Sequence, residues 1–107
     1  MMILEAQLRK GEILRYVFEG ITLRWADMRY TPDFLVFKPK TIEVDLNTCQ
    51  SATIEVAPQI ILIEVKGGHI WDRDIVRFKG ARAYWPEFAF EMWQKTKGEW
   101  KRKLATA

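Results

Sequence analysis

Cysteine, histidine and long apolar runs are all scarce in this 107-residue chain. Its one cysteine, Cys49, excludes an internal disulfide and suits a reducing compartment. Its one histidine, His69, has no second histidine with which to build a histidine-based zinc site. No apolar stretch reaches the length of a membrane span, and no signal peptide is visible. These absences predict a soluble, cytoplasmic protein that does not enter a membrane.

Charge of one sign is not in large excess either, because 17 basic residues face 14 acidic ones and the net charge is +3. This balance is compatible with binding a polyanion, yet many basic proteins bind no nucleic acid. The length allows one domain with a single core and little surplus. Function therefore has to be inferred from particular residues.

One segment with unusual charges is Ile60–Lys66, in which four consecutive branched aliphatic residues come before the charged ones. Such a run is typical of a strand in the middle of a sheet. Because side chains alternate across a strand, Glu64 and Lys66 share a face with Leu62. Desolvating either charge alone is expensive, so each needs a partner, a metal ion or water.

The other segment is Thr31–Phe37, in which Asp33 opens a second apolar run. Pro32 favours an extended chain just before that run. If the two strands pair, Asp33 can reach Glu64. Two carboxylates can hold a hard divalent cation that activates water, and a neighbouring lysine can orient that water or offset charge on a phosphorane. This combination suits hydrolysis of a phosphodiester.

The order of these residues, Pro-Asp, a spacer and then Glu-x-Lys, is that of the PD-(D/E)xK nuclease superfamily. More specifically, the chain resembles a family of small phage and prophage endonucleases related to Holliday-junction resolvases. The resemblance runs from about Gly11 to Trp93. The motifs that carry it include Gly11-Glu12-Ile13, Arg29-Tyr30-Thr31-Pro32-Asp33-Phe34, Glu64-Val65-Lys66-Gly67 and Ile70-Trp71-Asp72-Arg73-Asp74.

The resemblance implies a restriction-endonuclease-like α/β fold, with a mixed central sheet, a β-α-β crossover and flanking helices. It also implies a Mg²⁺- or Mn²⁺-dependent DNA endonuclease, acting on branched DNA in the cytoplasm of a bacterial host if the gene is phage-borne. Its products would carry 5′-phosphate and 3′-hydroxyl ends. A junction is resolved by two symmetric nicks, so a homodimer is expected.

The resemblance also assigns roles to residues. Asp33 and Glu64 would bind the metal with the Val65 carbonyl, and Lys66 would assist the attacking water. Nucleases of this superfamily often add an acidic residue from a preceding helix, and Glu5 is the acidic candidate there.

The pattern near the N-terminus predicts a short helix and a hairpin. Residues 2–10 can form about two helical turns, which Gly11 ends as a left-handed cap. Residues 12–18 and 21–26 predict two strands that turn at residues 19–20.

An added hairpin follows the first charged strand, which we expect to end at residues 38–40. Segments 41–45 and 53–56 both alternate apolar with polar residues, a pattern typical of exposed hairpin arms around a turn at residues 47–51. We interpret residues 41–58 as an insertion into the nuclease domain and as a candidate dimer interface.

A strand-helix-strand unit completes the domain. Asp72 predicts the N-cap of a helix over residues 72–84, and residues 87–93 predict a strand parallel to the central one. The domain then spans residues 1–94. Residues 95–107 form a basic C-terminal tail, which either adds non-specific DNA contacts or is disordered.

Three basic residues of the predicted helix are candidates for DNA binding. Arg73 and Arg77 share one side, which contacts the DNA backbone in a nuclease and is otherwise a solvated face. Lys79 falls among apolar residues, so we expect it nearer the sheet, either as a phosphate ligand or as a lysine that extends past the core edge. His69 is a loop residue that either touches substrate or has no such role.

Other interpretations of the motif stay open. Glu64 and Lys66 could be a structural ion pair at the end of a sheet, and Asp33 could be a turn former after proline. The chain could be a non-catalytic nucleic-acid-binding or phage assembly protein that retains the nuclease scaffold. It could also be an enzyme that acts on RNA or on free ends with the same metal site.

Overall fold

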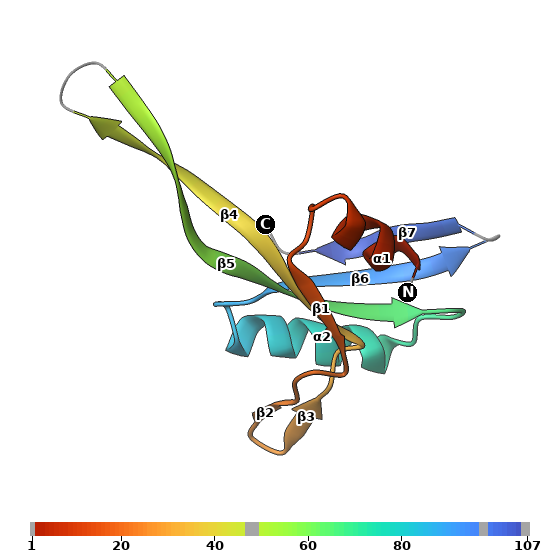
Figure 1. Ribbon diagram of the computed structural model, residues 1–107. Helices are drawn as coiled ribbons and strands as arrows, with labels where there is room; N and C mark the ends of the chain where they lie inside the picture. Colours follow the sequence, from red (N-terminus) through yellow and green to blue (C-terminus); the bar gives the residue numbers. More distant parts are fainter. Residues whose placement is uncertain (1, 47–49, 97–98, 106–107) are drawn as a thin grey trace.

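The computed structural model describes residues 2–46, 50–96 and 99–105. Within these ranges the chain forms two helices and seven strands, whose arrangement is drawn in Figure 1. They are α1 (Met2–Arg9), β1 (Arg15–Phe18), β2 (Leu23–Trp25), β3 (Met28–Tyr30), β4 (Phe34–Leu46), β5 (Gln50–Lys66), α2 (Asp72–Tyr84), β6 (Ala89–Thr96) and β7 (Glu99–Ala105). Cys49 and part of the predicted hairpin turn, residues 47–49, lie outside the described residues.

The main sheet has the strand order β1-β4-β5-β6-β7. Strands β5 and β6 are parallel and are joined through α2, whereas every other neighbouring pair in this sheet is antiparallel. The predicted α/β class, the mixed sheet and the β-α-β crossover are therefore confirmed. Neither helix in the described part of the chain is long and apolar enough to cross a membrane.

The alternating side chains of the sheet build a separate core on each of its faces. Leu62, Phe90 and Met92 pack with Phe78 of α2 on one face. On the other face Leu4 of α1 packs with a second set, which comprises Ile13, Val36, Ile61 and Ile63. Figure 1 shows the two helices on opposite sides of the sheet. The predicted division of the central strand into two faces is confirmed, and it places Glu64 and Lys66 on the α2 side.

Helix α1 ends as the sequence predicts. Gly11 has φ +75°, in the left-handed region that glycine adopts without a steric cost. The backbone N–H groups of Gly11 and Glu12 donate to the carbonyls of Leu8 and Gln7, at 3.2 and 2.9 Å. These bonds satisfy carbonyls that the end of the helix would otherwise leave without a donor.

The N-terminal strands pair differently from the prediction. Strand β1 pairs with β4, and β2 pairs with β3 as a separate two-stranded sheet. The chain reverses between Trp25 and Met28, where Ala26 has φ 48°. Alanine rarely adopts this conformation, so an alanine at position 26 does not indicate a turn in the way that glycine or asparagine would.

The β2–β3 hairpin packs against α2 (Figure 1). The Trp25 ring stacks on Tyr84, with ring centroids 6.3 Å apart. A Cβ atom on Gly80 would lie 3.4 Å from the Trp25 ring, an ordinary van der Waals distance, so the ring lies close over this part of the helix. At the open end of the hairpin, the hydroxyl oxygens of Thr22 and Thr31 are 2.7 Å apart and form a hydrogen bond.

The predicted exposed hairpin is present, because residues 41–46 pair with residues 50–55, but it is not a separate pair of strands, since β4 and β5 continue through it. The prediction that the first strand ends at residues 38–40 is wrong: the ladder has only a register shift between Lys38 and Lys40. Pro39 lies at that irregularity and has no N–H to donate. The outer part of β4 and β5, residues 40–46 and 50–56, forms an arm that extends away from the body (Figure 1).

The arm makes the molecule elongated. Its radius of gyration is 16.4 Å, whereas a compact domain of this length has about 13 Å. Among the residues that the structure describes, the two strands of the arm pair only with each other. A two-stranded ribbon of this kind is marginally stable alone. A partner that covers one of its exposed faces would therefore stabilise it.

The C-terminal segment was predicted to be a basic tail, but most of it forms strands that complete the sheet. Strand β6 extends to Thr96, and Glu99–Ala105 forms β7 beside it. Lys101 and Lys103 are exposed on this last strand. Lysines on an edge strand discourage pairing with another chain, which explains part of the basic composition without nucleic acid. Lys97 lies outside the described residues.

Candidate active site

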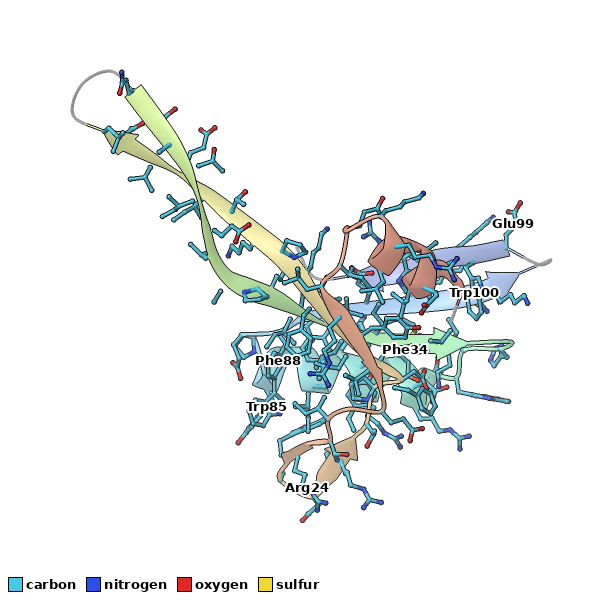
Figure 2. The ribbon with its side chains drawn as sticks, in the orientation of Figure 1. Arg24, Phe34, Trp85, Phe88, Glu99 and Trp100 are labelled. Carbon is cyan, nitrogen blue, oxygen red and sulfur yellow. The ribbon has the colours of Figure 1, made fainter. Side chains whose placement is uncertain are left out.

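The two predicted carboxylates meet where β4 begins and β5 ends. Phe34 lies opposite Ile63 in the antiparallel ladder, and Asp33 comes directly before that pair; Figure 2 shows Phe34 at this end of β4. One carboxylate oxygen of Asp33, Oδ2, accepts a hydrogen bond of 2.6 Å from the Val65 N–H. Pairing of the two strands therefore brings Asp33 to the end of β5, beside Glu64, as predicted.

Pro32 has a structural consequence for Val65. Continuing the register beyond Phe34 and Ile63 places Pro32 opposite Val65, and a proline has no N–H with which to bond the Val65 carbonyl. The N–H and C=O of one strand residue point to the same side, so this carbonyl faces the Asp33 side. On this register, Pro32 offers the Val65 carbonyl no backbone donor.

Glu64 is a partly buried carboxyl group with a strongly altered pKa. Burial is the largest cause of the rise of its pKa from 4.5 to about 7, and the adjacent Asp33 carboxylate adds to the rise. The ammonium group of Lys66 acts in the opposite direction. Two carboxylates this close compete for the same proton, and a cation placed between them would relieve their repulsion.

Lys66 lies between two carboxylates on the α2 side of the sheet. Its Nζ is 3.7 Å from Glu64 Oε1 and 3.6 Å from Asp74 Oδ1. Asp74 is a site residue that the sequence analysis did not identify, although the Trp-Asp-Arg-Asp motif contained it. It is the third residue of α2, which places its side chain beside the end of β5.

Asp74 also fixes the start of the helix. Its Oδ2 accepts the Trp71 backbone N–H at 3.2 Å. Trp71 is the N-cap residue, so the prediction of Asp72 as N-cap is wrong by one position. Burial alone would raise the pKa of Asp74, but the bond from Trp71 and the nearby Lys66 ammonium outweigh it and lower that pKa. Asp74 is therefore a carboxylate held in place from two sides.

Tyr30 completes the interior side of the site and was also missed by the sequence analysis. Its ring is buried, and its hydroxyl makes no hydrogen bond of ordinary geometry within the described residues. Burial is the largest cause of the rise of the Tyr30 pKa well above its usual value. The neighbouring charges of Glu64 and Asp33 raise it further, because a phenolate beside two carboxylates is unfavourable. Tyr30 stays a neutral hydroxyl facing the acids.

An open cleft of about 710 Å³ adjoins these residues. It lies between the β2–β3 hairpin, the end of β5 and the first turns of α2. Its lining is Arg24, Ala26, Asp27, Met28, Arg29, Tyr30, Thr31, Glu64, Lys66, Asp74 and Arg77. The walls are therefore mainly polar and carry both signs of charge, as a site for a metal ion and a phosphate requires.

The three helix residues predicted to bind DNA lie in different surroundings. Arg77 lines the cleft. Arg73 lies outside it, with its guanidinium over the Trp71 ring at 5.9 Å. Lys79 is exposed, because Phe78 and Ala81 are the helix residues that bury against the sheet. The expectation that Lys79 points toward the sheet is wrong, and Val76, one of the apolar residues on its side of the helix, is exposed as well.

Two further candidates also lie away from the carboxylates. The Glu5 carboxylate accepts a hydrogen bond from the Tyr16 hydroxyl, beside the core on the α1 face. His69 is exposed, and its ring lies edge-on to Trp71 with centroids 4.5 Å apart. Within the described part of the chain, no group of three or more His, Cys, Asp or Glu residues is placed to hold a metal.

The donor set at this site nevertheless fits magnesium. Mg²⁺ is commonly bound by one or two carboxylates together with waters and substrate phosphates, and it does not need an all-protein cage. Asp33 and Glu64 supply two adjacent carboxylates; burial is the main cause of the raised pKa of Glu64, and the Asp33 charge adds to it, because the two repel each other when both are ionised. Manganese prefers the same oxygen ligands.

No protein-family model matches the chain, and neither a curated protein nor a solved structure is significantly similar to it. Function therefore has to be inferred from the residues of the site.

Proposed function

We propose that the chain is a metal-dependent DNA endonuclease of restriction-endonuclease-like fold that acts on branched DNA. The observation that carries the proposal is the arrangement of Asp33, Glu64 and Lys66. The two carboxylates meet at the ends of paired strands, and the lysine lies beside one of them at an open cleft. The branched substrate is the part of the proposal that depends on the resemblance to the resolvase-related family.

In this mechanism the chain holds a metal ion and positions a water molecule. Asp33 and Glu64, with the Val65 carbonyl, would hold a Mg²⁺ or Mn²⁺ ion. When bound, that ion neutralises the substrate phosphate and lowers the pKa of water. Lys66, held between Glu64 and Asp74, donates hydrogen bonds to the attacking water or to phosphate oxygens on which charge develops.

The experiment that tests the function is cleavage of a labelled four-way junction and of a matched linear duplex, with Mg²⁺, Mn²⁺ or EDTA. The wild type is compared with Asp33→Asn, which keeps an oxygen to accept the Val65 N–H, and with Glu43→Gln on the arm as the matched control. Metal-dependent cleavage that Asp33→Asn loses and Glu43→Gln keeps supports the nuclease. Cleavage that survives in Asp33→Asn contradicts the assigned site.

The same assay separates the alternatives. Faster cutting of the junction than of the duplex supports a branched substrate. Cutting of a matched RNA with no cutting of DNA would favour a ribonuclease with the same site. The role of a non-catalytic binding protein is favoured by one observation, that Glu5 is bonded to Tyr16 and does not join the two acids. DNA that is bound but uncut with either metal would favour that role.

We also infer that the arm joins two copies of the chain as a homodimer. Ile42 lies opposite Ile54 and Val44 opposite Ala52, so the apolar residues of both strands share one face. Ile42, Leu46 and Ile54 are 42, 46 and 44% exposed on it.

The chemistry of the arm favours a second copy as the occupant of that face. The opposite face carries Glu43, Asp45 and Glu55, all exposed, so a polyanion would be repelled from the arm. From Ile42 to Leu46, and from Ala52 to Ile54, this face carries no charge, so that part of it is complementary to itself; Lys40, paired with Val56, lies at its base. Self-complementary patches form two-fold contacts, in which each ribbon covers the other.

Ile42→Lys combined with Ile54→Lys is expected to convert the dimer to a monomer. Each lysine would have to be buried in the contact, and this desolvation weakens association by at least about tenfold per side chain. Sedimentation equilibrium gives the mass of each variant. Thr41→Lys with Thr53→Lys, on the opposite face, is the matched control and should stay dimeric. A wild type that is monomeric at all concentrations overturns the inference.

A further inference from the structure

The outer face of the β2–β3 hairpin carries two arginines directly opposite each other. Arg24 and Arg29 are paired residues of the ladder, and both are exposed. Like charges at such a position are destabilising, because the two side chains leave the same face of the ribbon. Within the described part of the chain neither arginine forms an ion pair with an acid, and this includes Asp27 in the hairpin turn. An anion bound between the two guanidinium groups would relieve their repulsion.

The hairpin is held firmly from its inner face. Leu23 and Tyr30 are 3 and 5% exposed and belong to the core on the α2 side. Trp25 lies on Gly80 and stacks on Tyr84. Because side chains alternate along each strand, this inner anchoring turns Arg24 and Arg29 outward. Figure 2 shows Arg24 on the hairpin, beyond α2 as seen from the sheet.

The same two arginines line the cleft that contains the end of β5. Arg24 and Arg29 share this cleft with Glu64, Lys66 and Arg77. The hairpin thus extends a positively charged surface outward from the carboxylates. Arginine binds phosphate oxygens through two parallel N–H groups, and it is more weakly hydrated than lysine, so a pair of arginines suits a phosphate better than a general positive surface would.

We propose that Arg24 and Arg29 form a binding site for the phosphate backbone of the nucleic acid, and that the hairpin positions the strand across the cleft. The inference deepens the proposed nuclease function and rests on it for the identity of the anion. Arg77, on the first turns of α2, continues the contact on the other wall of the cleft. Neither hairpin arginine touches the carboxylates, so their role is to bind and position the strand.

The test measures binding without cleavage. Fluorescence anisotropy of a labelled duplex with EDTA gives the dissociation constant at several salt concentrations for the wild type and for Arg24→Gln with Arg29→Gln. Removing one phosphate-binding cation reduces the slope of log K against log salt by about 0.9. The double variant should therefore have a slope smaller by about 1.8 and bind about 10- to 100-fold more weakly at low salt.

Two controls make the result specific. Lys101→Gln with Lys103→Gln removes the same charge from β7, outside the cleft, and should change the slope by less than half as much. Near-ultraviolet circular dichroism, which reports the packing of the aromatic side chains, Trp25 among them, should be unchanged in the hairpin variant. An equal loss in both double variants would overturn the site and leave only a general charge effect. An unchanged slope in a folded hairpin variant would overturn it as well.

The outcomes also separate this inference from the proposed function. If the wild type cuts DNA and the hairpin variant keeps the wild-type slope of log K against log salt, the arginine site is overturned and the nuclease stands. If the wild type cuts nothing but the slope falls only in the hairpin variant, the binding site stands and the nuclease fails.

Discussion

Glu64→Gln is expected to stabilise the metal-free protein above pH 7 and at the same time to abolish metal-dependent cleavage. Folding raises the pKa of Glu64 from 4.5 to about 7. Between these values the folded state binds more protons than the unfolded state, so the free energy of unfolding falls as the pH rises, and it stays lower above pH 7. A neutral amide removes this loss.

The expected gain is about 2 kcal/mol at pH 8. A shift of this size corresponds to about 3 kcal/mol at 1.36 kcal/mol per unit, and the partial access of solvent to the carboxyl reduces it. At pH 5 or below, Glu64 is protonated in the folded protein, so the two proteins should differ little. Urea unfolding at both pH values in EDTA measures this difference.

Metal ions and a control variant complete this test. Mg²⁺ binds the ionised folded state, so it should raise the stability of the wild type at pH 8 and have little effect on Glu64→Gln. Glu43→Gln changes an exposed acid of the arm and should show no gain at either pH. A Glu64→Gln variant that loses stability equally at pH 5 and pH 8 would contradict the raised pKa of Glu64.

Much of the candidate site could be predicted from the sequence because it depends on strand geometry alone. An apolar run predicts a central strand, alternation fixes the face that Glu64 and Lys66 share, and pairing with the strand after Asp33 brings the acids together. These steps need only the residue pattern within each strand and the pairing of two strands. The structure confirms each of them, including the crossover that follows.

Contacts between different elements could not be predicted in the same way. Asp74 reaches Lys66 only because α2 begins close to the end of β5, and Tyr30 lies near Glu64 only because the β2–β3 hairpin packs against α2. Both contacts depend on the directions in which the connecting loops lead the chain, and the pattern of residues does not reveal these directions. The turn at Ala26 has no glycine, and the bulge near Pro39 lets one strand continue where a proline suggests an end.

Three parts of the chain each present a feature that a different partner would stabilise. The body holds a costly pair of acids at the sheet end, the hairpin presents paired arginines of like charge, and the arm presents an uncovered apolar face. Each is unfavourable in the isolated chain, and each would be relieved by a different binding event: a cation, a phosphate backbone and a second copy. Residual instability of this kind is expected at functional sites.

Lys66→Met is expected to lower the single-turnover cleavage rate by about 10²- to 10³-fold, the range for removal of a group that stabilises developing charge. DNA binding should change much less, because one cation among several in the cleft is removed. The rate is measured with Mg²⁺ and enzyme both saturating, so that chemistry and not binding is observed. Lys79→Met, on the exposed side of α2, is the matched control and should cut at nearly the wild-type rate.

Asp74→Asn tests how Lys66 is positioned. It should lower the rate by less than Lys66→Met, because Glu64 still contacts the ammonium group. If Asp74 acts only by holding Lys66, then Lys66→Met with Asp74→Asn should be no slower than Lys66→Met alone, since residues that act as a unit are not additive. Multiplicative losses in the double variant would show that Asp74 contributes to cleavage independently, and would move it from a positioning role to direct contact with the metal or the substrate.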